Sequence, residues 1–166
     1  AGAGRIKFGP TVKWAYLPQI IHFSHPERTL LDTMLYEKNC TVQTARDRLG
    51  AYLFEGEDVF KTVGSLSGGE QSRLRLCMLM DEKINLLILD EPTKGIDVGA
   101  KSEFYNMICE FAKEGLAVIL ISSELPEVIG LSDRIIVMRG RRIVGEISAK
   151  DATEEKLLSM AMMEET

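Results

Sequence analysis

The sequence predicts an α/β fold built on a parallel sheet. Two apolar runs, at residues 84–93 and 117–123, flank an amphipathic segment at residues 100–114. Runs of this kind are typical of strands that are buried on both faces, as the strands of parallel sheets are. The segment between them has helical spacing and is followed by Gly115, a common helix end; its inward residues are Phe104, Ile108 and Phe111. Strand, helix and strand in this order indicate parallel strands in one sheet.

The first half of the chain predicts one strand and then helices. Residues 11–17 alternate with the period of a strand, and the residues that share one face are Val12, Trp14 and Tyr16. From about residue 26 to residue 60 the chain is polar and helical in character. The apolar residues at helical spacing there are Ala45, Leu49, Tyr52 and Leu53.

The end of the chain predicts a hairpin or two edge strands, followed by a closing helix. Residues 134–139 and 141–148 have strand character and are separated by Gly140. Residues 153–163 are expected to form the helix. The chain has neither internal repeats nor a low-complexity stretch.

Length and composition are those of one globular domain. The chain has 166 residues, of which 45% are hydrophobic and 27% charged. The formal charge of −5 gives no direct sign of nucleic-acid binding, which usually needs a basic face. Cys40, Cys77 and Cys109 lie far apart without metal-ligand spacing, which predicts free thiols in a reducing compartment. No apolar run approaches the roughly 18 residues that a membrane-spanning helix needs.

A pair of carboxylates ends the first apolar run, in the sequence Leu89-Asp90-Glu91. Because a buried strand can carry charge only at its end, we expect Asp90 and Glu91 at the rim of the sheet, where α/β proteins bind ligands. One carboxylate there can hold Mg²⁺, usually through a water, and the other can orient or deprotonate an attacking water. A strand followed by a capping acid explains the dipeptide equally well.

Residues 65–80 predict a turn that leads into a helix. A serine precedes two glycines, and the helix that follows has Leu74, Met78 and Leu79 on one side. Glycines at this place let backbone N–H groups approach an anion, and the helix N-terminus adds its positive dipole end. The alternative is a cap and a turn without a ligand.

These segments together resemble the ABC ATPases in order and spacing. The resemblance rests on Gln19 after a strand, LSGGEQ at 66–71, LLILDEPT at 86–93 and then Asp97, and it covers nearly the whole chain. It implies a P-loop NTPase-like nucleotide-binding domain, with a helical subdomain at about 26–80 and the Walker B half of the α/β core at 84–166. It also implies ATP and Mg²⁺ as cofactors, and phosphoryl transfer to water as the reaction.

The resemblance also implies a role for each motif. Gln19 resembles the Q-loop glutamine, which touches Mg²⁺ and the attacking water. Asp90 resembles the Walker B aspartate at Mg²⁺, Glu91 the catalytic base, and Asp97 the D-loop residue that crosses a dimer interface. The residues that resemble the signature, which closes over ATP held by the opposite domain, are Ser67, Gly68, Gly69, Glu70 and Gln71.

One motif of this family is absent from the sequence. The 166 residues contain no G-x-x-x-x-G-K-[ST] loop, the backbone nest and lysine that bind the β- and γ-phosphates. That loop lies upstream of the Q-loop strand, so we expect the chain to begin just after it, without the Walker A strand, loop and helix. We expect an apolar gap beside the sheet, and therefore aggregation, dimerisation or a partner that fills it. Lys7 and Lys13 are interpreted as solvated strand charges rather than substitutes for the lysine.

A second departure lies at residues 121–125. Many ABC ATPases have a histidine here that hydrogen-bonds the γ-phosphate, and this chain has Glu124. An anion facing a phosphate repels it, which predicts weak hydrolysis. Alternatively, Glu124 points to solvent near a helix start. His22 and His25 fall far earlier and are interpreted as surface loop residues.

The two halves resemble different subfamilies. Residues 1–93 resemble the ABC-F proteins, several of which act on ribosomes, and residues 94–166 resemble the second cassette of sugar-import ATPases, where a glutamate at the switch position is usual. This predicts a chimeric chain joined near the LDEPT motif.

Two classes of function remain open. The first is a catalytic part of a cassette, which hydrolyses ATP only with a partner that carries the missing loop; the second is a docking module without activity. Expected partners are a second cassette or a second copy, and by resemblance a membrane transporter subunit or the ribosome. The expected location is the cytoplasm, with a possible position at the inner face of the membrane.

Overall fold

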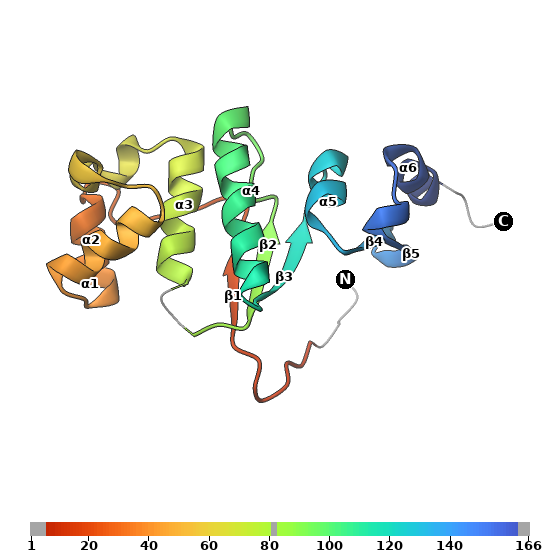
Figure 1. The fold of residues 1–166 in the computed structure, drawn as a ribbon, viewed down its shortest axis with the longest axis horizontal. Helices are drawn as coiled ribbons and strands as arrows, with labels where there is room; N and C mark the ends of the chain where they lie inside the picture. Colours follow the sequence, from red (N-terminus) through yellow and green to blue (C-terminus); the bar gives the residue numbers. More distant parts are fainter. Residues whose placement is uncertain (1–5, 81–82, 163–166) are drawn as a thin grey trace. The chain divides into compact units, whose positions relative to one another are not determined.

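The computed structural model describes residues 6–80 and 83–162, which form two compact units that divide within a strand, between Ile119 and Leu120 (Figure 1). The elements of the first unit are β1 (Trp14–Leu17), α1 (Leu30–Lys38), α2 (Val42–Ala51), the 3-10 helices η1 (Gly56–Phe60) and η2 (Val63–Ser65), α3 (Gly68–Leu79), β2 (Leu86–Asp90), α4 (Val98–Lys113) and the start of β3 (Ala117–Ile121). Those of the second unit are α5 (Leu125–Leu131), β4 (Arg134–Arg139), β5 (Arg142–Ser148), the 3-10 helix η3 (Ala149–Asp151) and α6 (Glu154–Met162).

The central sheet has the order β1-β2-β3. β1 and β2 pair in parallel, with Trp14 opposite Leu86 and Leu17 opposite Leu89. The connection between them runs through the helices α1 to α3. The predicted α/β fold with a parallel sheet is confirmed.

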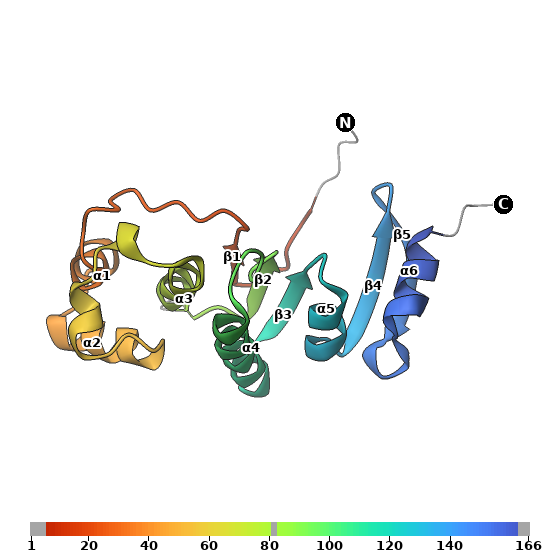
Figure 2. The same ribbon diagram turned by 90° about the horizontal axis from the view of Figure 1, so that it is seen from above.

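One face of the β1–β2 pair is buried and the other is largely open. α3 contacts β1, and α4 lies along one face of the sheet (Figure 2). The buried residues alternate along the two strands and are Ala15, Leu17, Leu87 and Leu89. On the opposite face the side chains of Trp14 and Tyr16 are 49% and 40% exposed. These two side chains form an exposed aromatic surface on β1, whereas the apolar gap expected from the missing motif and the self-association expected from that gap stay predictions.

The strands differ from the sequence analysis in extent and burial. β1 begins at Trp14, so the exposed Lys13 precedes it, and the exposed Lys7 also lies outside any strand. The prediction that the second apolar run is buried on both faces is wrong, because Ala117, Ile119 and Ile121 of β3 are exposed. Burial depends on what covers a strand, and the residues of the strand do not contain that information.

The helices of the first unit enclose a separate apolar core. Its buried residues come from α1, α2, the two 3-10 helices, α3 and the connections between them, and they are Leu30, Met34, Ala45, Leu49, Phe54, Val59, Val63, Leu66, Leu74, Cys77 and Met78. α1 and α2 are capped by Thr29 and Thr41, whose hydroxyls accept from the backbone N–H of Asp32 and Thr44.

Helix α2 is shorter than the apolar spacing predicts. Ala45 and Leu49 are buried as expected, but the helix ends at Ala51. Tyr52 caps it, and Leu53 is left-handed with a φ of 65° and 46% exposed. The chain must turn here because Phe54, rather than Leu53, enters the core.

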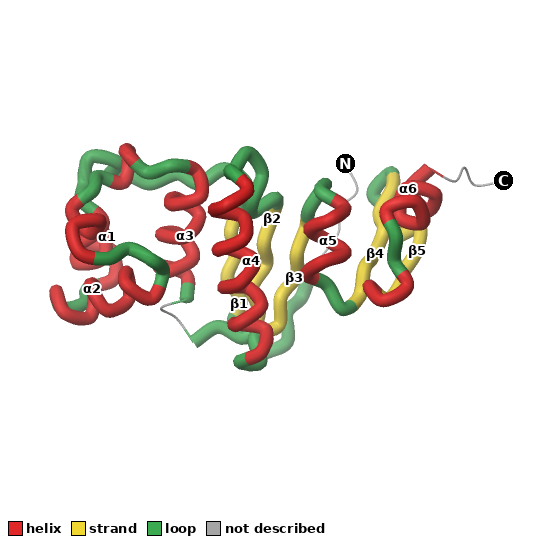
Figure 3. The backbone as a smooth tube through the Cα atoms, turned by 45° about the horizontal axis from the view of Figure 1, so that its top comes forward, coloured by secondary structure: helices red, strands yellow, loops and turns green. Residues whose placement is uncertain are grey.

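The second unit contains the predicted hairpin. β4 and β5 are antiparallel, and their turn consists of Gly140 and Arg141 with φ values of 55° and 69°. Two successive left-handed residues match the twist of a tight hairpin turn. Helix α6 packs on both strands (Figure 3); residue 163 of the predicted closing helix lies outside the described residues. Across residues 6–80 and 83–162, no helix combines the length and apolarity that a membrane span requires.

Candidate functional site

The carboxylate pair lies at the carboxyl end of β2. Asp90 is the last residue of the strand, and Glu91 follows it in a left-handed conformation with a φ of 47°. The carbonyl of Glu91 accepts from the backbone N–H of Lys94 at 3.2 Å, and Gly95 turns the chain towards α4 with a φ of 77°. A left-handed glutamate costs of order 1–2 kcal/mol relative to ordinary backbone. Sites that store such strain are often functional, so this backbone supports a role for Glu91.

Tyr16 contacts Asp90 across the two paired strands. Its phenol O–H donates a hydrogen bond of 2.6 Å to Oδ2 of Asp90. This bond, with a smaller effect of burial, raises the pKa of Tyr16 above its ordinary value, because the carboxylate stabilises the protonated phenol. Sequence analysis did not identify Tyr16 as a site residue. The alternation of residues 11–17 shows which face of β1 carries Tyr16. Only the register of β1 against β2 shows that Asp90 lies on the same face of the sheet.

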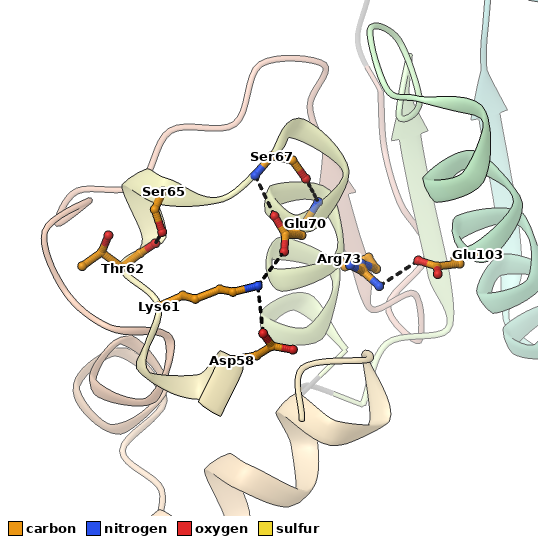
Figure 4. Close-up of polar contacts among 8 residues, drawn as sticks. All are labelled: Asp58, Lys61, Thr62, Ser65, Ser67, Glu70, Arg73 and Glu103. Atoms are coloured by element: carbon orange, nitrogen blue, oxygen red, sulfur yellow. Dashed lines mark hydrogen bonds and ion pairs between the residues drawn. The ribbon is translucent and has the colours of Figure 1, made fainter. Parts of the chain in front are cut away.

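The turn before α3 is built as a capping box (Figure 4). The hydroxyl of Ser67 accepts from the backbone N–H of Glu70 at 3.3 Å, and Oε2 of Glu70 accepts from the backbone N–H of Ser67 at 2.8 Å. Lys61 pairs with Glu70 at 3.3 Å and with Asp58 at 2.8 Å. Gln71 donates through Nε2 to the carbonyl of Leu66 at 3.1 Å. The cap and turn considered as the alternative are therefore present, and a ligand role for this segment stays a prediction.

The start of α3 packs against the turn that follows β2. The hydroxyl of Ser72 donates to the carbonyl of Pro92 at 3.4 Å. A Cβ at Gly69 would lie 2.8 Å from Cβ of Ala100 and 3.1 Å from a methyl carbon of Ile96, closer than side chains approach. Only glycine lets the helix come this near. The two segments that carry the candidate chemistry are therefore joined within the first unit.

Further along α3, Arg73 connects the helical core to α4. Its guanidinium pairs with Glu103 at 2.8 Å (Figure 4) and lies over the ring of Phe54, 5.3 Å from the centroid. The arginine side chain is 12% exposed, whereas that of Glu103 is 49% exposed, so solvent screens the pair from the glutamate side. This contact adds a polar link between α3 and α4 to the close packing of Gly69 on Ala100.

Glu70 gives the capping box a pH dependence. Partial burial alone would raise the pKa of Glu70, but the hydrogen bonds from Ser67 and the ion pair with Lys61 hold it below its ordinary value overall. The pKa of Glu70 is therefore lower in the folded state than in the unfolded state. Ionised Glu70 stabilises the fold above the ordinary glutamate pKa of about 4.3, and this contribution is lost as the pH falls through that value towards the folded-state pKa.

We therefore expect Glu70→Ala to lower the free energy of unfolding by about 1 kcal/mol at neutral pH, and by clearly less at about pH 3.5. Urea unfolding followed by circular dichroism at both pH values measures the difference. Glu57→Ala removes the same charge from η1 outside the capping box and is the matched control. An equal loss at both pH values would show that the carboxylate does not titrate with folding.

The remaining site residues lie at element ends. Gln19 is exposed and follows β1 by two residues, at the sheet edge where β2 also ends. Asp97 caps α4, its Oδ1 accepting from the backbone N–H of Ala100 at 3.0 Å. Gly68 is the first residue of α3. The histidines His22 and His25 are exposed between β1 and α1, as predicted for surface loop residues.

Glu124 belongs to the second unit. It is half-buried at the start of α5, and its backbone N–H donates to the hydroxyl of Ser122 at 3.0 Å. The same hydroxyl donates to Oε2 of Glu127, whose side chain is buried. Sequence analysis did not identify Ser122 and Glu127. Their hydrogen bonds restrain the backbone at Glu124.

The donor set at the sheet edge fits a nucleotide-bound Mg²⁺ better than a resident metal. In residues 6–80 and 83–162, no group of three or more His, Cys, Asp or Glu side chains is arranged to hold a metal. Mg²⁺ keeps several waters and usually takes one or two carboxylates plus phosphate oxygens. Asp90 and Gln19 could supply such ligands. A pocket of about 410 Å³ lined by Val12, Lys13, Trp14, Lys83 and Ile84 lies at the opposite edge of the sheet and has no part in this site.

The parallel sheet and the packing of α3 on the turn after β2 are features of one class of protein. Comparison with known families identifies that class. Residues 9–94, just over half of the 166 residues, match the family model described as ABC transporter. The chain belongs to the ABC transporter family.

Two solved structures share the fold. An ABC transporter in an inward-facing conformation has a TM-score of 0.70 and 15% identity, and the match covers 89% of this chain and 62% of that chain. The ADP conformation of MJ1267, an ATP-binding cassette of an ABC transporter, has a TM-score of 0.66 and 20% identity, over 89% of this chain and 63% of that one.

The curated relatives are named for sugar import. The arabinose import ATP-binding protein AraG of Mannheimia succiniciproducens is 56% identical over 100 residues, which are 60% of this chain and 20% of the relative. AraG of Pectobacterium atrosepticum is 41% identical over 143 residues, 86% of this chain and 28% of the relative. The ribose import protein RbsA 2 of Burkholderia pseudomallei is 48% identical over 122 residues, 72% of this chain and 24% of the relative. The chain thus spans about a quarter of the length of these relatives.

These matches bear on the expected subfamilies. A match of 143 residues must include residues on both sides of Lys94, so one sugar-import relative resembles both halves of the chain. The resemblance to sugar-import cassettes is supported. The ABC-F resemblance of residues 1–93, the chimeric junction and a ribosomal partner stay predictions.

Proposed function

We propose that this chain contributes to an ATP-hydrolysing cassette of a sugar importer, with the catalytic carboxylates at the end of β2 and the signature at the start of α3. The observation that carries the proposal is the packing of α3 on the turn after β2, through Ser72 and Gly69. It joins a helix N-terminus, which favours anions, to a carboxylate pair at the ligand-binding edge of a parallel sheet. The names of the relatives support sugar import.

Each residue has a separate task in this proposal. Asp90 and Gln19 would hold Mg²⁺ through oxygen atoms, and Glu91 would accept the proton of the attacking water. When bound, Mg²⁺ neutralises charge on the phosphate oxygens. Ser67 to Gln71 present the N-terminus of α3 to ATP held by a second cassette, and Asp97 lies at that contact. Glu124 has the place in the sequence where many ABC ATPases have a histidine, and a negative charge facing the phosphate would weaken hydrolysis.

The proposal includes a partner. The 166 residues carry no G-x-x-x-x-G-K-[ST] loop, and in this proposal a partner cassette supplies the loop that holds the phosphates of ATP. A second cassette and a membrane transporter subunit fit the family, which also favours a cytoplasmic position at the inner face of the membrane.

Calorimetry with Mg·ATP tests the proposal. We expect the chain alone to give weak heat that Asp90→Asn removes, and a polypeptide with the phosphate loop to tighten binding at least about tenfold. The oligomeric state is followed in the same samples by light scattering. Tight binding that Asp90→Asn leaves unchanged would place the nucleotide elsewhere and refute the assignment.

A docking module without activity is the second candidate, and the open apolar face of β1 favours it. Trp14 and Tyr16 are 49% and 40% exposed there, as at surfaces that bind another protein. Absence of nucleotide heat both alone and with the added polypeptide, together with complex formation, would support this candidate.

A further inference from the structure

Strand register brings Tyr16 to the end of β2. Tyr16 is the parallel partner of Ile88, and Asp90 lies two residues further on the same face. Two residues of a strand span about 6.6 Å, which a tyrosine side chain can reach and a serine or threonine cannot. The phenol therefore lies along the sheet face towards Asp90, and its oxygen is 2.6 Å from Oδ2.

Burial does not force this contact. Tyr16 is 40% exposed and Asp90 is half-buried, so water could satisfy both groups if they were apart. The distance is that of a charge-assisted hydrogen bond from a hydroxyl to an ionised carboxylate. Its geometric effect is to restrain the rotation of the Asp90 carboxylate, because one of its two oxygens has a fixed donor.

We infer that Tyr16 is a positioning residue for Asp90: its phenol O–H holds Oδ2, so that the second oxygen is presented to Mg²⁺. This inference rests on the proposed function, which takes Asp90 as the residue that holds the ion. Tyr16 does not touch the ion or the nucleotide in this role. Its hydrogen bond reduces the number of orientations that the Asp90 carboxylate adopts. Less conformational entropy is then lost when the ion binds, which favours binding.

The chain contains its own reporter for a test. Trp14 is its single tryptophan and precedes Tyr16 by two residues on the same open face of β1. Mn²⁺ is paramagnetic and replaces Mg²⁺ at oxygen sites. Binding of Mn²⁺ at Asp90 should therefore broaden the indole N–H signal of Trp14 in a nitrogen-15 NMR spectrum of the full chain, and added Mg²⁺ should reverse the broadening.

We expect Tyr16→Phe to need about two- to tenfold more Mn²⁺ for half-maximal broadening, which corresponds to the loss of one hydrogen bond. The variant keeps the ring and removes the hydroxyl. Tyr36→Phe removes a hydroxyl from the exposed face of α1 and should leave the titration unchanged. Asp90→Asn should abolish saturable broadening. Circular dichroism checks that all variants are folded.

The outcomes separate this inference from the proposed function. Unchanged or tighter Mn²⁺ binding in Tyr16→Phe, with Asp90→Asn still abolishing it, would overturn the positioning role alone. Broadening that Asp90→Asn leaves intact, or no saturable broadening in the parent chain, would refute Asp90 as the ion-holding residue and the positioning role with it.

Discussion

Leu74→Lys is expected to unfold the helical core of the first unit. Leu74 has no exposed surface and lies on α3 among the side chains that α1, α2 and α3 bury together. An ammonium group at this place has no partner and loses its hydration, which costs at least about 3–5 kcal/mol. Domains of this size have roughly 5–15 kcal/mol of net stability, so this is a large part of the total.

Urea unfolding followed by circular dichroism measures the effect, and limited proteolysis shows which segment opens. Leu53→Lys is the matched control, because Leu53 lies in the same part of the chain and is 46% exposed. We expect the control to change the free energy of unfolding by less than about 0.5 kcal/mol. A Leu74→Lys midpoint equal to that of the control would contradict the position of α3 in the core.

The Leu74→Lys variant also tests whether the candidate site depends on the stability of the helical core. The N-terminus of α3 carries Ser67, and the helix is held in place by the core on one side and by the Ser72–Pro92 contact on the other. Opening of the core releases the candidate signature from the turn after β2. Weak Mg·ATP binding through Asp90 should then survive only to the extent that the sheet remains folded.

The elements that sequence analysis located correctly are those with a local cause. The capped helix start at Ser67 follows from a serine and the Glu70 carboxylate three residues later. The hairpin turn follows from Gly140 between two strand-like segments. The place of Asp90 and Glu91 follows from the end of an apolar run. In each case the residues that decide the structure are neighbours in the chain.

The features that were missed depend on segments far apart in the sequence. The Tyr16–Asp90 bond joins residues 74 positions apart and exists only in one strand register. The pairing of Arg73 with Glu103 requires the packing of α3 on α4. The exposure of Ile119 depends on what covers β3. Periodicity indicates which residues share a face, but it does not indicate which face another element covers.

Glu91→Gln is expected to reduce ATP hydrolysis by about 10²- to 10⁴-fold, the usual contribution of a general base. The amide keeps the size and shape of the side chain, but it replaces one acceptor oxygen by an NH₂ donor and cannot take a proton from water. Phosphate release is measured for the chain mixed with a polypeptide that carries the phosphate loop. Nucleotide binding by calorimetry should remain within about twofold of the parent, because the carboxylate of Asp90 is unchanged.

A second substitution at the same position separates catalysis from backbone strain. Glu91 is left-handed with a φ of 47°, a conformation that glycine adopts without strain. We expect Glu91→Gly to be up to about 1 kcal/mol more stable than the parent in urea unfolding, and as inactive as Glu91→Gln. If the protein becomes more stable when the Glu91 carboxylate is removed, that carboxylate does not serve stability, and its role lies in the chemistry. Hydrolysis by both variants at the parental rate would show instead that Glu91 is a strained turn residue and that the base lies elsewhere.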